Sequence, residues 1–176
     1  MQQPSAEALI FPDSRLSYQQ LNQSARNWAK ALIAKGVQPG QNVGILLTTR
    51  PDFISILFGI MMAGAVAVPV NARYQAGELS FLIQDADLVL LITTGHVADS
   101  LDFGKRLTAA LPSLERANDP EALALDEAPL LKSIICLDPP APPYLFNANA
   151  ALALGRTISD EAVDARIDAV DPLDTA

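Results

Sequence analysis

The stretch from Asn42 to Asn71, NVGILLTTRPDFISILFGIMMAGAVAVPVN, decides the fold of this chain. A first apolar run is followed by a turn at Arg50-Pro51-Asp52, and a second apolar run continues to a break at Gly64. A short third run ends at Pro69, and no charge occurs from Phe53 to Ala72. We therefore expect the stretch to supply most of the interior of the molecule.

Two interpretations of this stretch compete, a buried strand–helix–strand unit and a membrane span. The uncharged run has about the 20 residues that one span requires. However, Gly64 and Pro69 interrupt it, and its last part is short and rich in β-branched residues. A proline cannot donate to a strand ladder, so it marks the end of a strand. We therefore predict a strand at 43–47, a buried helix at 53–62 and a strand at 65–70, with no integral membrane segment.

The preceding segment contains the clearest helix signal in the sequence. Ser17 and Gln20 have the spacing of a capping box, in which each side chain bonds the backbone of the other residue. An apolar stripe follows with helical spacing: Leu21, Ala25, Trp28, Ala29, Leu32 and Ile33. Gly36 is suited to the left-handed conformation that ends helices. Two short runs around Pro12-Asp13-Ser14 indicate a small hairpin before this helix.

Further strands and helices alternate along the rest of the chain. Thr49 is the expected cap of the buried helix. The other expected elements are helices at 79–86, 97–108 and 159–170, strands at 88–92 and 134–137, and an extended Pro-rich segment at 138–143; residues 144–154 show no clear face. Such alternation is typical of α/β proteins. We predict a mostly parallel sheet with helices on both faces, divided into an N-terminal subdomain at 1–137 and a Pro-rich and helical segment at 138–176.

Composition restricts the function. The net charge of the 176 residues is −8, which argues against nucleic acid as a partner, because that requires clustered Lys and Arg. A single cysteine, Cys136, excludes an intramolecular disulfide and fits a reducing compartment. One cysteine and one histidine also argue against a His/Cys zinc site. No secretory leader is evident at the N-terminus, so we expect a cytoplasmic protein.

Candidate catalytic residues are few. No phosphate-binding G-x-x-x-x-G-K-[ST] loop, G-x-G-x-x-G fingerprint or G-x-S-x-G elbow occurs. His96 follows a predicted strand but stands alone, and a structural role at a helix start is the simpler interpretation. Cys136 lies within a predicted strand and is expected to be an inert buried thiol. Arg73 is the best candidate for an anion contact, because it is an isolated cation directly after a buried strand.

The region from Ala8 to Thr93 resembles the N-terminal part of the adenylate-forming acyl-CoA synthetases of the AMP-binding superfamily. The resemblance rests on the order and spacing of short motifs, among them the family's G-A-V-x-x-P-x-N-P-R pattern, which ends in Arg73 here and in which Ala72 replaces the common proline. The matching residues are Tyr18, Leu21, Gly36, Val37, Gly40, Val43, Pro51, Gly64, Ala65, Val66, Pro69, Asn71, Arg73, Glu78 and Leu79. The NARYQAGEL form looks more like acyl- or aryl-CoA ligases than like peptide-synthetase adenylation domains.

The resemblance implies a two-step reaction. A carboxylate attacks the α-phosphate of Mg²⁺-ATP to give an acyl-adenylate and pyrophosphate, and the CoA thiol then displaces AMP. The family's ATP and Mg²⁺ motifs are expected beyond Ala176, so no catalytic or metal-binding residue is assigned within the chain. For Arg73 the resemblance implies a contact near the nucleotide end of CoA, where a guanidinium suits a phosphate.

We therefore expect part of an ATP-dependent carboxylate–CoA ligase, inactive as an isolated chain. The expected cofactors of the complete enzyme are ATP, Mg²⁺ and CoA, and its partners are CoA and a small carboxylic acid, with a homodimer left open. The alternative is a non-catalytic module that binds a partner or a CoA-like ligand.

Overall fold

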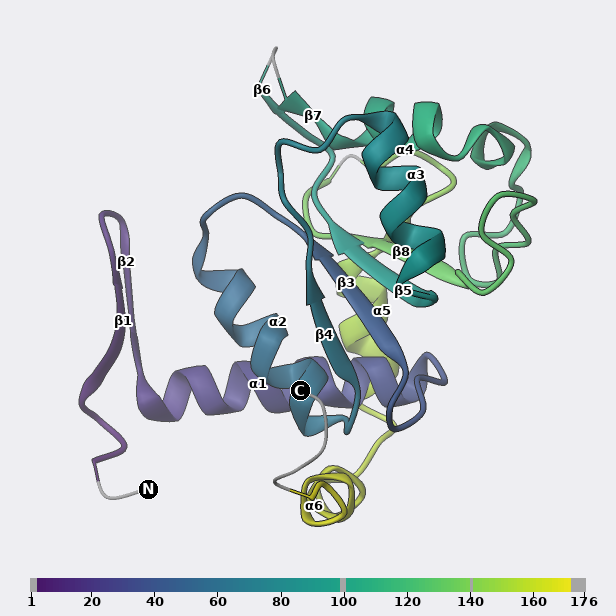
Figure 1. Cartoon of the computed structure of the whole chain (residues 1–176). Helices are drawn as coiled ribbons and strands as arrows, with labels where there is room; N and C mark the ends of the chain where they lie inside the picture. The colour runs from purple at the N-terminus through teal and green to yellow at the C-terminus, as the bar shows by residue number, and fades with distance from the viewer. Residues whose placement is uncertain (1–2, 99–100, 140, 172–176) are drawn as a thin grey trace. The chain divides into compact units, whose positions relative to one another are not determined.

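The computed structural model describes residues 3–98, 101–139 and 141–171, which form two compact units. One unit contains the described residues within 1–40, 48–66 and 152–176, and the other contains those within 41–47 and 67–151. Because the chain passes between the units several times, each unit combines segments that are distant in sequence. Figure 1 labels most of the helices and strands along the chain.

The first unit, which we call the helical unit, has a hairpin followed by packed helices. Its elements are β1 (Glu7–Phe11), β2 (Ser14–Ser17), α1 (Tyr18–Ala34), α2 (Pro51–Met62) and α6 (Asp160–Asp168). The predicted capping box at the start of α1 is confirmed: Gln20 N donates to Ser17 Oγ at 3.3 Å, and Ser17 N donates to Gln20 Oε1 at 2.8 Å. The predicted left-handed stop at Gly36 is confirmed as well, with φ of 84°.

The interior of the helical unit lies between α1 and α2, which cross closely. Apolar residues of the predicted α1 stripe are buried, including Trp28 at 4% exposure. They face α2, whose Ile56 and Ile60 are fully buried. Gly64 ends α2 with φ of 75°, as its position after the apolar run predicted. The expected cap at Thr49 is wrong: Pro51 occupies the first position of the helix, so the capping position is that of Arg50, which forms no side-chain cap.

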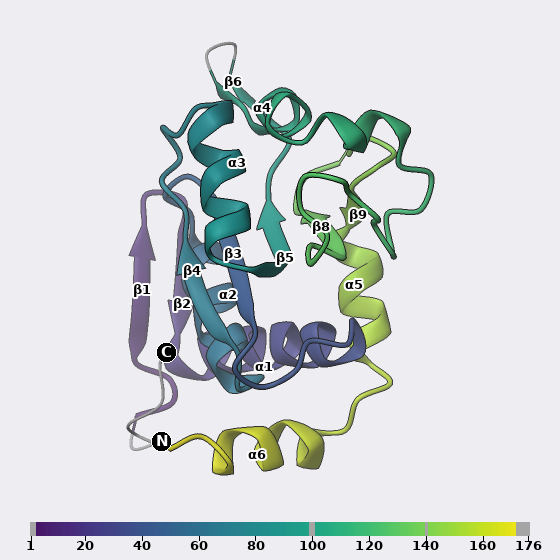
Figure 2. The ribbon, with the colours of Figure 1, turned by 45° about the vertical axis from the view of Figure 1, so that its right-hand side comes forward.

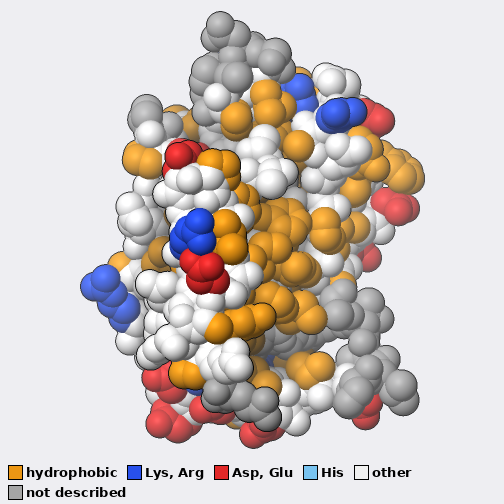
Figure 3. Space-filling model, turned by 90° about the vertical axis from the view of Figure 1, so that its left-hand side faces the viewer, with side chains coloured by type: hydrophobic (Ala, Val, Ile, Leu, Met, Phe, Trp, Pro, Cys, Tyr) orange, Lys and Arg blue, Asp and Glu red, His pale blue; other side chains and the backbone are white. Residues whose placement is uncertain are grey.

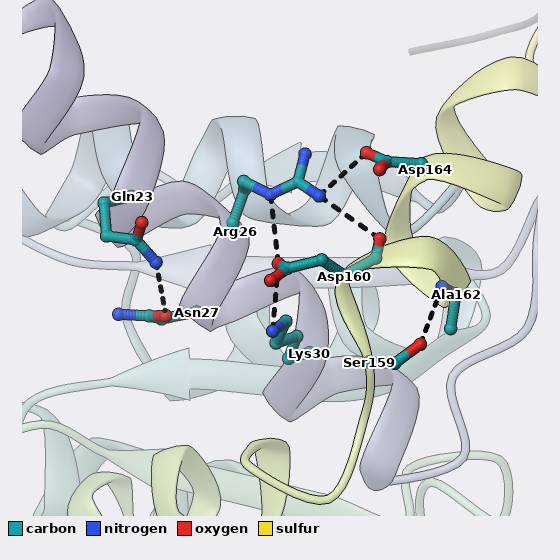
Figure 4. A network of polar contacts seen from close by, with 8 residues as sticks. All are labelled: Gln23, Arg26, Asn27, Lys30, Ser159, Asp160, Ala162 and Asp164. Carbon is teal, nitrogen blue, oxygen red and sulfur yellow. Dashed lines mark hydrogen bonds and ion pairs between the residues drawn. The ribbon is translucent and has the colours of Figure 1, made fainter.

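Helix α6 is attached to α1 by a cluster of charged side chains (Figure 4). Arg26 Nη2 donates to Asp164 Oδ1 at 2.7 Å and to the Asp160 backbone oxygen at 3.2 Å, while Lys30 Nζ lies 3.0 Å from Asp160 Oδ1. Hydrogen bonding to Asp164 raises the pKa of Arg26, and hydrogen bonding to Lys30 lowers the pKa of Asp160. The predicted cap of this helix is confirmed, because Ser159 Oγ accepts from Ala162 N at 3.2 Å.

The second unit, which we call the sheet unit, contains a five-stranded sheet in the order β4-β3-β5-β8-β9. The strands are β4 (Val66–Pro69), β3 (Asn42–Leu46), β5 (Leu88–Thr93), β8 (Ser133–Cys136) and β9 (Phe146–Asn147). The pairs β3–β5, β5–β8 and β8–β9 are parallel. The predicted α/β fold with a mostly parallel sheet is therefore confirmed.

Helices α3 (Ala76–Asp85) and α4 (Phe103–Ala110) pack on the sheet of this unit (Figure 2). Leu79 and Ile83 of α3 share an apolar cluster with Leu91 of β5, and Phe103 of α4 is fully buried in it. The cluster continues under the turns that follow α4, which include the short helix η1 (Pro112–Arg116). Burial of these side chains is the main stabilising contribution to the unit.

Two expectations for the chain after β5 are wrong. The helix expected at 97–108 begins only at Phe103, because residues before it form the small hairpin β6 (His96–Ala98) and β7 (Leu101–Asp102). Asp102 caps α4 through its carboxylate, which accepts from Lys105 N at 2.9 Å. The segment 144–154, which had no predicted element, contains β9 and α5 (Ala148–Gly155).

Among the described residues, no helix combines the length and the apolarity that crossing a membrane demands. The uncharged run that raised this alternative is divided between α2, with 12 residues, and β4, with four.

Candidate functional site

The carboxyl ends of the parallel strands in the sheet unit meet at one edge. Leu46 of β3 pairs with Thr93 of β5, and Thr93 pairs with Cys136 of β8. The loop after β4 starts at the same edge, because Val70 N donates to Ile45 O of β3 at 2.9 Å. Ligands of open parallel sheets bind outside this end of the strands. The residues that leave the strands here are therefore the candidates for a functional site.

Two buried threonines occupy the middle of this edge. Thr93 Oγ1 contacts the backbone oxygens of Leu46 and Thr94 at 3.0 and 3.1 Å. The hydroxyl of Thr94 is buried, and it has no hydrogen-bond partner in the part of the chain that the structure describes. Cys136 lies beside them, fully buried, and its thiol donates to Asp138 O at 3.4 Å. The burial expected for this cysteine is confirmed.

The loop from Asn71 to Gln75 carries Arg73 away from the end of β4. Arg73 N donates to Asn71 Oδ1 at 2.9 Å, and Tyr74 N donates to Asn71 O at 3.0 Å, so the loop begins as a turn held by an asparagine side chain. Gln75 N donates to Glu78 Oε2 at 2.9 Å at the start of α3. The backbone on both sides of Arg73 is thus fixed by local hydrogen bonds.

The side chain of Arg73 is exposed, in contrast to its backbone. Among the described residues, its guanidinium has no hydrogen bond or ion pair. The five N–H donors of a guanidinium suit a phosphate or a carboxylate. The structure places Arg73 in the loop after β4, which is a half-buried edge strand and not the buried strand that was expected. The ligand contact of Arg73 stays a prediction.

Arg106 of α4 also contacts this loop. Its Nη1 donates to Ala72 O at 2.9 Å and to Tyr74 O at 3.3 Å. Arg106 is half-buried, whereas the neighbouring Lys105 is exposed and lies 3.8 Å from Asp102. The sequence gives no signal for the Arg106 contact, because it joins residues more than 30 positions apart.

A groove of about 460 Å³ runs beside the loop along the outer face of α3. Its lining is mainly apolar and includes Tyr74, Gly77, Phe81 and Leu82. Phe81 is 68% exposed, which is unusual for a phenylalanine. Figure 3 shows one face of the molecule, on which hydrophobic side chains are also exposed.

His96 belongs to a short strand, and the described acidic side chains form no metal-binding cluster. His96 lies in strand β6 and not at a helix start, which corrects the expectation for its position. Residues 3–98, 101–139 and 141–171 contain no group of three or more histidine, cysteine, aspartate or glutamate side chains that could hold a metal ion.

Glu127 accepts hydrogen bonds from Ser113 Oγ and, at 3.1 Å, from Ser113 N, and the hydroxyl contact lowers the pKa of this carboxyl group.

Comparison with known sequences yields matches along almost the whole chain. A sequence model described as "AMP-binding enzyme" matches residues 1–166. The putative acyl-CoA synthetase YngI of Bacillus subtilis (strain 168) is 26% identical over 170 residues, which is 96% of this chain and 31% of that protein. Tyrocidine synthase 3 of Brevibacillus parabrevis is 31% identical over 134 residues, which is 69% of this chain and 2% of that protein. The chain thus spans less than a third of either relative.

Solved structures share the fold. The anthranilate CoA ligase AuaEII, in complex with anthranoyl-AMP, superposes with a TM-score of 0.68 at 21% identity over 86% of this chain and 25% of that chain. The N-terminal domain of FACL13 from Mycobacterium tuberculosis superposes with a TM-score of 0.60 at 24% identity, over 89% of this chain and 33% of that one. At these identities the superpositions establish the fold alone.

Proposed function

This chain belongs to the AMP-binding enzyme family, and on that premise we propose that the complete protein is an ATP-dependent carboxylate–CoA ligase. The observation that carries the proposal is the match to the family over residues 1–166. The similarity to a putative acyl-CoA synthetase over 96% of this chain supports it. In the proposed reaction, a carboxylate oxygen attacks the α-phosphorus of ATP and releases pyrophosphate. The sulfur of CoA then attacks the acyl carbon, and AMP leaves.

The part of this chain in that reaction is to provide a scaffold and one phosphate contact. The exposed guanidinium of Arg73 would bind a phosphate at the nucleotide end of CoA through paired, charge-assisted hydrogen bonds. Its lack of other partners in the described structure, together with its place at the carboxyl edge of the sheet, supports this assignment. Mg²⁺ would neutralise charge on the ATP phosphates, and we assign it no ligand among the described residues.

The test is a pyrophosphate-release assay with Mg²⁺-ATP and a panel of carboxylic acids, followed by detection of the acyl-CoA product. We expect the complete protein to release pyrophosphate only when a carboxylic acid is present, and to form the thioester when CoA is added. The 176-residue chain alone should release none. Acid-dependent pyrophosphate release by this chain would contradict its proposed inactivity, and the lack of release by the complete protein would refute the ligase assignment.

A second candidate function is a non-catalytic module that binds a CoA-like nucleotide. The exposed guanidinium of Arg73 favours this second function, because a protein can bind a phosphate without any catalytic residue. Calorimetric titration with CoA and with ATP separates the two functions. CoA binding by a complete protein that releases no pyrophosphate would support the module.

A further inference from the structure

Four successive carbonyl groups in the loop after β4 all accept hydrogen bonds. Asn71 O accepts from Tyr74 N at 3.0 Å, and Arg73 O accepts from Gln75 Nε2 at 3.2 Å. The other two, Ala72 O and Tyr74 O, accept from Nη1 of Arg106. A surface loop ordinarily leaves such groups to water and is mobile in consequence. This loop is instead held along its length, and Arg106 binds it from another element, α4.

The two carbonyl groups that Arg106 binds belong to the residues on either side of Arg73. The direction of a side chain follows from the backbone conformation at its own and adjacent residues. Fixing Ala72 and Tyr74 therefore limits the directions in which Arg73 projects. A preorganised cation loses less conformational entropy when it binds a ligand than one on a mobile loop does.

We propose that Arg106 is a positioning residue for Arg73: it fixes the two flanking carbonyl groups and so presents the Arg73 guanidinium to a phosphate of a CoA-like nucleotide. The proposal rests on the phosphate contact assigned to Arg73 under the proposed function. Arg106 itself is engaged with the loop backbone and does not touch the phosphate. Two other roles of Arg106 are distinct from positioning. In one, Arg106 only adds positive charge near the phosphate. In the other, its loss lowers the stability of the chain and leaves the affinity for the phosphate unchanged.

The test is a double-mutant cycle on the full chain, with adenosine 3′,5′-bisphosphate as the probe and calorimetry as the measurement. The variants are Arg73→Gln, Arg106→Gln and the combination of both. Lys105→Gln is the matched control, because it removes the same charge from the neighbouring position of α4 without touching the loop carbonyls. Thermal unfolding of each variant sets a titration temperature at which all of them are folded.

We expect Arg73→Gln to weaken binding by about tenfold or more, which corresponds to the loss of a charge-assisted hydrogen bond. Arg106→Gln should weaken binding several-fold, more than Lys105→Gln does. In the Arg73→Gln background, Arg106→Gln should have no further effect, because there is no guanidinium left to position. Arg106→Lys retains a donor and a charge, so it should recover part of the loss.

The possible failures are distinguishable. If Arg106→Gln weakens binding no more than Lys105→Gln, or if its effect persists in full after Arg73 is removed, the positioning role is refuted while the phosphate contact stands. If Arg73→Gln leaves the affinity unchanged, the phosphate contact is wrong and the positioning role falls with it. An absence of saturable binding to the wild-type chain would refute both.

Discussion

Gly59 of α2 lies where the two long helices of the helical unit cross, and its replacement by alanine tests the packing there. A Cβ atom at this position would lie 2.5 Å from Trp28 Cβ, 2.8 Å from Ala25 O and 3.2 Å from Ala29 N of α1. None of these atoms can rotate away, because two belong to the backbone and the third is bonded to it. The helices would have to separate by about 1 Å to restore ordinary contact distances.

Two opposing effects decide the magnitude. Alanine favours a helix over glycine by about 1 kcal/mol. Overpacking a well-packed interior costs ~1–3 kcal/mol, and the rigid contacts at Gly59 place it near the upper end. The Gly59→Ala variant should therefore lose about 2 kcal/mol of unfolding free energy, which lowers Tm by about 4–8 °C in a chain of this length.

Gly77 of α3 provides the matched control. A Cβ atom there would meet nothing within 4 Å, so Gly77→Ala should keep the propensity gain and lose nothing in packing. Because this residue lies in the first turn of its helix, we expect stabilisation by only about 0.5 kcal/mol. The two substitutions are chemically identical and should act in opposite directions.

Calorimetry and far-UV circular dichroism measure both variants. The fluorescence of Trp28, the single tryptophan of the chain, additionally reports the crossing itself, where this residue is 4% exposed in the wild type. If Gly59→Ala proves as stable as the wild type, with an unchanged tryptophan spectrum, the close approach of α1 and α2 at this residue is wrong.

Three further predictions concern polar contacts. Ser17→Ala removes the cap of α1 and should lower the free energy of unfolding, measured with a chemical denaturant, by about 1 kcal/mol. Thr49→Ala removes no cap and should change it by less than ~0.5 kcal/mol. Equal effects of the two substitutions would contradict this assignment of the caps. Ser113→Ala should raise the pKa of Glu127 toward its ordinary value of 4.5 in an NMR titration, and an unchanged pKa would refute the contact. The pKa of Asp160 is lowered from 3.8 in the folded state, so the stability that its carboxylate contributes is complete above pH 3.8 and is lost as the pH falls through the folded pKa. The free energy of unfolding should therefore decrease less below pH 3.8 in Asp160→Asn than in the wild type. An identical pH dependence of the two proteins would exclude this contribution.

Sequence reasoning succeeded where the structural cause is local. The start of α1 follows from Ser17 and Gln20, which lie three residues apart and bond each other. The cap of α2 was misplaced by one residue for an equally local reason. Proline favours the first helical position, so the residue before Pro51 takes the capping position, and Thr49 lies one residue too early.

Helix α5 was missed because its sequence, ANAALALG, consists mostly of small apolar residues and has no polar face. A periodic pattern is the main sequence signal of a helix, and this segment has none. Helix α4 was expected too early because Val97 and Leu101 continue its apolar spacing backwards. Those two residues instead belong to the paired strands β6 and β7.

For the candidate site, the position of Arg73 was predictable from the sequence, whereas the contacts that orient it were not. Arg73 could be located from its neighbours, because a cation directly after a strand must leave the sheet at the end of that strand, even though β4 is a half-buried edge strand. The contact from Arg106 could not, since it joins α4 to carbonyl groups 34 and 32 residues away, and any arginine on that helix face would look alike in sequence. Gly59 is a parallel case, because its importance comes from the backbone of another helix. Contacts between distant segments determine the orientation of the side chains in a site. The identity of the candidate residue, Arg73, could therefore be argued from the sequence, whereas its orientation required the structure.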